Sequence, residues 1–218
     1  MTIRFRSFLL GGGLLAAATS HAYAHPHVFA EARLEVAVKD GNVEALRHVW
    51  RFDDLFSSTV LFEFDQNRDL KLDHEELEMV GSVIHESLAE FGYFQFVTAD
   101  GKDIAMNAPE SIVAMFENQQ LMIVFESRPA EVLALDGDLH FGVYDPTFYT
   151  AIDFYDDDNL VVVAMPEACA KKVVRPDPDE ALAMNQQSLT DAFFNDPGGV
   201  DMSKLFATRL ELTCGAEG

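Results

Sequence analysis

Two stretches of the sequence carry side chains that could bind a cation. In the first, His25 and His27 flank a single proline directly behind an apolar segment. If His25 is the first residue of the mature protein, its amine and ring nitrogen can hold one metal ion together, and His27 can supply a further nitrogen. Amine and imidazole nitrogens suit copper, zinc, nickel or cobalt. We therefore expect a transition-metal site at the mature amino terminus; the alternative is a terminus that binds nothing.

Further ligands for this site must come from elsewhere in the chain. The usual copper(II) motif of amino termini needs a deprotonated amide at the second residue, and Pro26 has no amide proton. His48 is a further candidate, but it stands close to Trp50 in an expected strand, which favours a packed residue over a ligand. The predicted ligand set is His25, His27, His140 and Asp145.

The second stretch is acidic and has the sequence DQNRDLKLDHEEL, from residue 65 to residue 77. Counted from its first residue, oxygen-bearing groups stand at the positions that bind calcium in an EF-hand-like helix–loop–helix. These residues are Asp65, Asn67, Asp69, Lys71 (through its backbone carbonyl), Asp73 and Glu76. Alternate oxygens converge on a hard divalent cation when the chain wraps around it, so the spacing predicts a calcium-type loop.

The sixth position of this loop departs from the calcium pattern. A calcium loop has glycine there because the backbone turns sharply, and this chain has Leu70. A branched side chain in a left-handed conformation costs roughly 1–2 kcal/mol, which lowers the affinity for calcium. Two alternatives stay open: a loop with bound calcium, and a metal-free loop that its own hydrogen bonds hold in shape.

The first residues have the features of an export signal. Two arginines precede an apolar segment that is too short for a membrane span, which needs roughly 20 apolar residues. The sequence AYA, which ends at Ala24, then matches the small-x-small pattern that signal peptidase cleaves. We predict a Sec-type signal peptide over residues 1–24, cleaved after Ala24, with an uncleaved anchor as the alternative. The mature chain is expected to have no membrane-spanning segment.

The composition indicates a folded and strongly acidic protein. Apolar residues make up 49% of the chain, which has 18 phenylalanines, and this argues against a disordered chain. The formal net charge of −22 repels nucleic acids and anionic lipid headgroups, so we expect neither as a partner. The same charge attracts cations, although acidity in most proteins serves only solubility.

The chain has two cysteines, Cys169 and Cys214, and both follow the expected signal peptide. In an oxidising compartment an even pair most simply forms a disulfide. The alternative is a thiolate metal site, which is weaker because the chain has no CxxC spacing and no histidine beside either cysteine. We therefore predict a disulfide that ties the carboxyl terminus to the rest of the fold.

Alternating apolar residues predict an α+β fold with mainly antiparallel sheets. Two strands are expected over 28–39 and 43–52, joined by a turn at Asp40, Gly41 and Asn42. Shorter apolar runs at regular intervals predict further strands in the segments 94–105, 111–127, 138–145, 148–156, 160–165 and 206–214.

Helical spacing of apolar residues interrupts these strands. It predicts one helix over 53–64 and a second over 74–92 that ends at its glycine. Together with the acidic loop they form a helix–loop–helix inserted at about 53–92. A short helical segment is expected over 176–197, and we treat residues 25–218 as one domain.

Five stretches of the chain, in this order, resemble a family of bacterial periplasmic proteins. They are HPHVF behind the leader, WRFDDLFS, the acidic loop, EFGYF and YDPTFY. The family is a conserved domain of unknown function, loosely described as a periplasmic component of an ABC-type transport system. Its members are frequently encoded beside, or fused to, nickel/cobalt-type transporters. The resemblance covers nearly the whole mature chain and implies a periplasmic location, a role in transition-metal handling and a membrane metal transporter as partner.

Three hypotheses on function follow. The first is a periplasmic, non-enzymatic accessory protein for nickel, cobalt, zinc or copper transport or homeostasis, with a calcium-type loop that stabilises the fold. The second is a copper-dependent oxidative enzyme that uses the amino-terminal histidine. The third is an interaction module without a transition metal, with the aromatic stretch YDPTFY as its binding face. A solute-binding protein of two lobes is disfavoured because the chain is short for that architecture.

Overall fold

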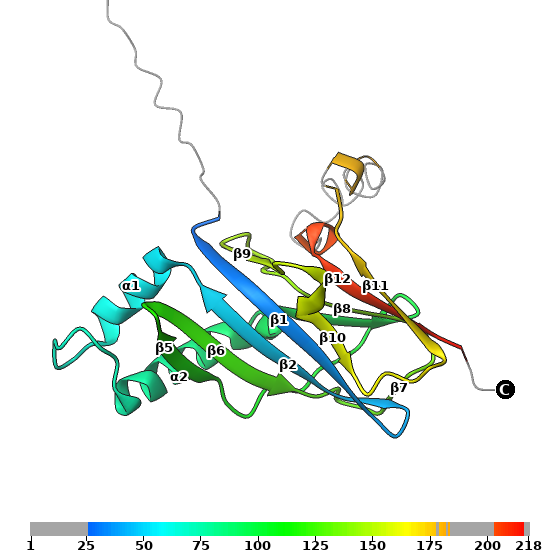
Figure 1. Cartoon of the computed structure of the whole chain (residues 1–218), viewed down its shortest axis with the longest axis horizontal. Helices are drawn as coiled ribbons and strands as arrows, with labels where there is room; N and C mark the ends of the chain where they lie inside the picture. Colours follow the sequence, from blue (N-terminus) through cyan, green and yellow to red (C-terminus); the bar gives the residue numbers. More distant parts are fainter. Residues whose placement is uncertain (1–25, 178, 182, 184–202, 216–218) are drawn as a thin grey trace, which may run out of the picture.

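The computed structural model describes residues 26–177, 179–181, 183 and 203–215, and most of its strands belong to two β-sheets (Figure 1). The larger sheet has the strand order β10 (Leu160–Val163), β1 (Val28–Lys39), β2 (Asn42–Phe52), β6 (Gln120–Ser127) and β5 (Val113–Glu117), with β7 (Leu133–Ala134) beside β2 and β9 (Thr150–Asp153) beside β1. The second sheet has the order β11 (Cys169–Val174), β12 (Arg209–Cys214), β8 (Gly137–Val143), β3 (Gln95–Ala99) and β4 (Lys102–Asp103). The expected α+β class is confirmed.

The hairpin of β1 and β2 occupies the middle of the larger sheet and matches the two expected strands. The two strands pair antiparallel along nearly their whole length. The first half of β1 buries every second residue: Val28, Ala30, Ala32, Leu34 and Val36. At the turn, Asp40 and Gly41 both have positive φ values, 50° and 72°, as a tight two-residue hairpin requires.

The pairing is mainly antiparallel, as expected, but the larger sheet is mixed because two of its pairs are parallel. Both β9 and β10 pair with β1 in parallel, with Thr150 opposite Val28 and Leu160 opposite Leu34. Parallel neighbours need a crossover connection, and the alternation of apolar residues within a strand does not reveal its direction. The second sheet is antiparallel throughout its pairings.

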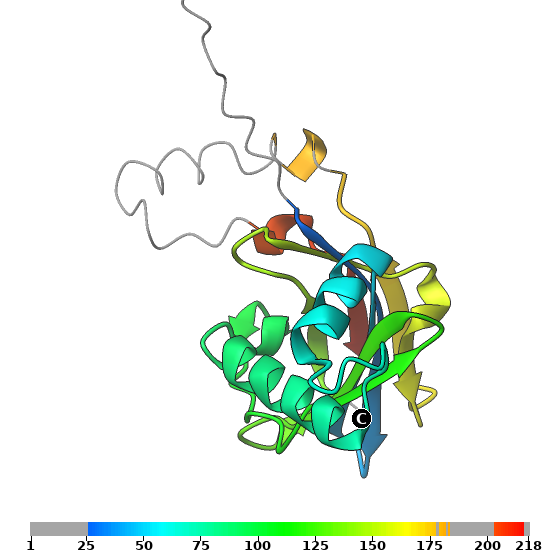
Figure 2. The ribbon, with the colours of Figure 1, turned by 90° about the vertical axis from the view of Figure 1, so that its left-hand side faces the viewer.

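Helices α1 (Asp54–Phe64) and α2 (His74–Ala89) pack beside β6 and β5, and Figure 2 shows both helices in front of the larger sheet. The predicted helix–loop–helix is therefore present. The second helix ends at Ala89, earlier than expected. Its expected last residue, Gly92, has a φ of 59° and begins a short 3-10 turn in which Tyr93 is also left-handed. This turn reverses the chain into β3.

An aspartate caps the start of each helix. The carboxylate of Asp53 accepts a hydrogen bond from the backbone N–H of Phe56, and its second oxygen accepts one from Phe29 in β1. Asp73 and Glu76 form a capping box at the start of α2, in which each side chain accepts a backbone N–H of the other residue. The hydrogen bond between Phe29 and Asp53 also ties α1 to the larger sheet.

At Gly81, α2 rests directly on the backbone that leads into the edge strand β5. A Cβ atom at Gly81 would lie 2.3 Å from the carbonyl oxygen of Ile112 and 3.7 Å from the amide nitrogen of Ala114. Only a residue without a side chain fits this contact. The helix therefore covers a strand whose open edge could otherwise pair with another chain.

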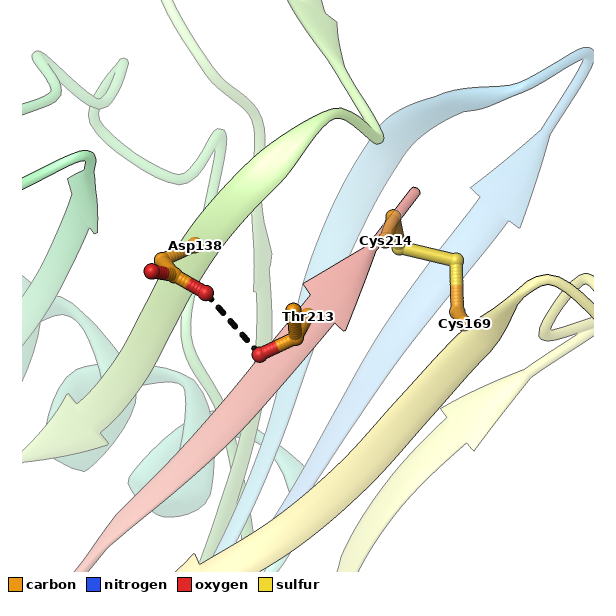
Figure 3. Close-up of a disulfide and its surroundings, with 4 residues drawn as sticks. All are labelled: Asp138, Cys169, Thr213 and Cys214. Atoms are coloured by element: carbon orange, nitrogen blue, oxygen red, sulfur yellow. Dashed lines mark hydrogen bonds between the residues drawn. A yellow bond between two sulfur atoms is a disulfide. The ribbon is translucent and has the colours of Figure 1, made fainter. Parts of the chain in front are cut away.

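The predicted disulfide is present in the second sheet. Cys169 of β11 and Cys214 of β12 are register partners with Cα atoms 4.1 Å apart. On the other side of β12, the Thr213 hydroxyl donates to the Asp138 carboxylate of β8 at 2.9 Å (Figure 3). The two cysteines are 45 residues apart in sequence, and in the chain-entropy model a loop of this size stabilises a fold by about 3–4 kcal/mol.

The core lies where the inner face of the larger sheet meets the second sheet and the helices. Its fully buried residues include Leu34, Leu46, Leu121, Ile123, Leu139, Phe141, Leu160, Leu210 and Leu212. Two expected segments fall outside the described residues, the signal peptide over 1–24 and most of the helical segment over 176–197. None of the described helices is long and apolar enough to cross a membrane.

Candidate functional site

His27 lies just ahead of β1, at the start of the described chain. Its backbone N–H donates to the carbonyl oxygen of Tyr149 at 2.8 Å, and the two side-chain rings lie 5.1 Å apart. The residue is exposed. Because the next residue is already paired with β9, His27 presents an accessible imidazole on a fixed backbone. The other half of the predicted chelate, His25, lies outside the described residues.

Asp145 is buried in the loop between β8 and β9, near the start of β1. One carboxylate oxygen accepts hydrogen bonds from the backbone N–H and the hydroxyl of Thr147, both at 2.7 Å, and the other accepts from the N–H of Thr150 at 2.8 Å. Thr150 is the register partner of Val28, the residue that follows His27. Asp145 thus belongs to the same end of the molecule as His27, where its carboxylate shapes the loop.

His140 lies in a different place from the other candidate ligands. It is half-buried on β8, between Thr98 of β3 and Glu211 of β12 in the second sheet. His27 and Asp145 lie instead near the first residues of β1. Within the part of the chain that the structure describes, no three His, Cys, Asp or Glu side chains are grouped as a metal site.

His48 is a core residue, as its position near Trp50 indicated. It is fully buried, its ring stacks on Phe125 with centroids 4.4 Å apart, and its Nε2 lies 3.2 Å from the amide oxygen of Gln95. Burial lowers the pKa of His48 from 6.5 to about 4. Its Nδ1 has no hydrogen-bond partner among the described residues, so a proton there would be buried without an acceptor. The ring is therefore neutral near pH 7 and does not serve as a surface ligand.

The acidic loop between α1 and α2 is held by hydrogen bonds from its own backbone. The Asp65 carboxylate accepts from the N–H groups of Asp69 at 3.1 Å and Leu70 at 2.8 Å. Asn67 accepts from the N–H of Asp69 at 2.8 Å, and Asp69 accepts from the N–H of Lys71 at 2.9 Å. The side chains at the first, third and fifth positions therefore turn towards the loop backbone.

Two further residues determine how this loop could hold a cation. Leu70 has a φ of 63°, the left-handed conformation expected at the sixth position, so a strain of roughly 1–2 kcal/mol applies there. Glu76 is buried, and its two oxygens accept the N–H groups of Gln66 at 2.8 Å and Asp73 at 2.9 Å. Calcium coordination by Glu76 would require the carboxylate to exchange these bonds for the ion.

A cavity of about 410 Å³ lies between α1, α2 and the sheet, and sequence reasoning did not predict it. This volume falls in the range of small-molecule sites, roughly 300–1,000 Å³. Its deepest residues include Trp50, Val60 and Val80, which are 1%, 6% and 0% exposed. The Trp50 indole N–H is buried and has no hydrogen-bond partner within the described residues. Most of the wall is apolar, with a few polar residues such as Thr59 and Glu63 at its margin.

Four of the five stretches that carry the family resemblance contribute to this cavity. Val28 comes from HPHVF, Trp50 from WRFDDLFS, Phe94 from EFGYF and Tyr149 from YDPTFY. In the sequence each resembled an ordinary core residue, because the segments are far apart and only the fold joins them. The available signal was α1, whose apolar residues lie on more than one face: Phe56 and Val60 line the cavity, whereas Leu55 and Phe62 are exposed.

Together, these features describe an α+β protein with a two-sheet framework, an inserted helix–loop–helix and an apolar cavity beneath its helices. The chain belongs to the family described as "Protein of unknown function (DUF1007)", whose model matches residues 11–214. It is also 22% identical over 196 residues to an uncharacterized protein of Haemophilus influenzae. That alignment covers 88% of this chain and 91% of the relative, so the two proteins correspond over nearly their whole length.

Proposed function

We propose that this protein is a periplasmic accessory protein that binds nickel, cobalt, zinc or copper at its mature amino terminus and serves the transport or homeostasis of that metal. The observation that supports the proposal is the exposed imidazole of His27, whose backbone N–H is bound to Tyr149 just behind the expected cleavage site. The amine and ring of His25 would complete a chelate of nitrogen ligands, which these metals favour. The role is binding rather than catalysis.

The position of Asp145 favours it as a further ligand over His140. Asp145 is near the start of β1, whereas His140 belongs to the second sheet. We propose His25 and His27 as the primary ligands, with a carboxylate oxygen of Asp145 as an additional one. A membrane metal transporter is the proposed partner, as the family resemblance implies.

The acidic loop is proposed to bind calcium in an EF-hand-like manner and to stabilise the fold. The support is the spacing of the oxygen-bearing residues and the left-handed backbone of Leu70 at the sixth position, as a calcium loop requires. An ion that binds only the folded state adds its binding free energy to stability. The strain at Leu70 lowers the affinity by about tenfold, which a compartment with millimolar calcium tolerates.

Titration calorimetry of the mature chain, without an added tag, tests the transition-metal proposal. Nickel, cobalt, copper and zinc are titrated separately into the chain that begins at His25. One ion is expected to bind per chain, and the double variant His25→Ala, His27→Ala is expected to lose this binding. His74→Ala is the matched control, because His74 is exposed on α2 and remote in sequence. Unchanged affinity in the double variant would refute the amino-terminal site.

Thermal unfolding with calcium and with a chelator tests the loop separately. Calcium is expected to raise the melting temperature of the natural chain, and Asp65→Asn is expected to remove this rise because it takes away a charged ligand. The control Asp54→Asn changes an exposed acidic residue of α1 outside the loop. Equal melting temperatures with calcium and with chelator would exclude a calcium site, and would leave the amino-terminal proposal intact.

A further inference from the structure

The cavity beneath α1 and α2 combines depth with an apolar wall. It reaches the fully buried Val80 and the nearly buried Trp50, and its apolar lining includes Phe56 of α1 and Ile84 of α2. A ligand with a hydrocarbon chain binds such a cavity favourably, because the chain leaves water on binding. The favourable free energy of binding grows with the apolar area that is buried. Its contents are therefore expected to be hydrocarbon rather than a metal ion or a sugar.

The charge at the margin of the cavity limits the headgroup of such a ligand. Two carboxylates, Glu63 on α1 and Asp145, belong to the lining, and among the described residues of the lining none is basic. The hydroxyl-bearing Thr59, Ser87 and Thr147 are the other polar members. A carboxylate or phosphate headgroup beside Glu63 would meet like charge, within a chain of net charge −22.

We propose that this cavity binds single-chain amphiphiles whose headgroup is cationic or uncharged. The hydrocarbon chain lies between α1, α2 and the sheet, above Trp50, and the headgroup lies at the margin near Glu63. This inference goes beyond the proposed metal-binding role and does not depend on it. Segments from four separate parts of the sequence line this cavity, and the proposal assigns them one shared function.

The chain provides its own reporter for the test, because Trp50 is its single tryptophan and lines the cavity. Three probes with the same ten-carbon chain are titrated below their aggregation limits: decylammonium, 1-decanol and decanoate. Decylammonium and decanol are expected to shift the Trp50 emission saturably. Decanoate is expected to bind at least about threefold more weakly than decylammonium, the scale of an exposed charge interaction.

Two pairs of variants separate the cavity from non-specific binding. Val83→Phe fills the cavity from α2, at a residue that is 48% exposed, and is expected to weaken decylammonium binding about tenfold by removing room for the hydrocarbon. Its control, Val132→Phe, alters a residue that is 86% exposed and outside the cavity, and is expected to leave binding unchanged. Glu63→Lys is expected to reverse the preference between decylammonium and decanoate, whereas Glu117→Lys is not.

Three results would overturn the proposal. If neither decylammonium nor decanol shifts the emission saturably, the cavity does not bind amphiphiles. Equal weakening by Val83→Phe and Val132→Phe would place the probes elsewhere on the surface. If Val83→Phe does not fold, which circular dichroism reveals, the Glu63→Lys comparison decides alone: an unchanged headgroup preference refutes the assignment of the head to this margin.

Discussion

Replacing His48 by leucine is expected to flatten the loss of stability that this protein shows in acid. His48 is fully buried and its pKa is lowered to about 4, mainly because burial disfavours the charged ring. In the unfolded chain the same side chain titrates at its ordinary pKa of 6.5. Between these two pH values the unfolded chain binds a proton at His48 and the folded chain does not. Folding therefore becomes less favourable as the pH falls.

The size of the effect follows from the difference between the two pKa values. At about 1.36 kcal/mol for each pKa unit, the shift at His48 corresponds to roughly 3 kcal/mol once the pH is below both pKa values. The penalty is nearly absent well above pH 6.5, grows as the pH falls towards 4, and reaches roughly 2–3 kcal/mol at pH 4.5. Among the described residues, no charged side chain shifts this pKa; the hydrogen bond to Gln95 is the one effect that opposes burial.

Urea unfolding at pH 7.5, 6.0, 5.0 and 4.5, followed by far-ultraviolet circular dichroism, measures this difference. The free energy of unfolding of the natural chain should fall relative to that of His48→Leu by roughly 2–3 kcal/mol across this range. His74→Leu, an exposed histidine on α2, should behave like the natural chain. Parallel curves for the natural chain and His48→Leu would refute the reasoning, because carboxylate titration affects both chains alike.

Three further predictions concern stability. Leu70→Gly relieves a residue held at φ 63°, and the free energy of unfolding in calcium-free urea should rise by about 1 kcal/mol; a fall would mean that the strain is absent. Gly81→Val places a side chain 2.3 Å from the carbonyl oxygen of Ile112 and should cost at least about 2 kcal/mol in the same assay, which a neutral result would contradict. Replacing Cys169 and Cys214 by serine should cost about 2–4 kcal/mol, measured by the loss of melting temperature, and an unchanged melting temperature would show that the disulfide does not stabilise the fold.

The elements with a strong local signal were predictable from the sequence. The alternation in β1 and β2 matched the observed strands, since each strand buries one face. The helical spacing of apolar residues predicted both α1 and α2, although α2 ends earlier than expected. The disulfide followed from the export signal and the count of cysteines alone.

Features that depend on distant partners were not predictable. The parallel pairing of β9 and β10 with β1 arises from the path of the chain, which no local pattern encodes. Strand β11, with the sequence CAKKVV, was missed because its two lysines hide any alternation. It forms by pairing with β12, to which the disulfide also joins it.

The candidate site also has some features that the sequence predicts and others that depend on distant partners. The position of Leu70 within the acidic loop predicted its left-handed backbone, because the loop geometry is local. The grouping of His140 with His27 and Asp145 depends on long-range contacts that no local pattern encodes, and it stays a prediction; His140 lies on β8 in the second sheet. The cavity around Trp50 was not predictable either, because four separate segments form its walls.

The freed amine and the ring of His25 are proposed to hold one metal ion together with His27. The most direct test compares the zinc affinity of the chain that begins at His25 with that of the same chain extended by Ala24. The extension leaves both imidazoles in place but moves the free amine away from the ring. The extension is expected to weaken zinc binding by about tenfold or more, because one ligand is lost. Equal affinities would mean that the freed amine is not a ligand.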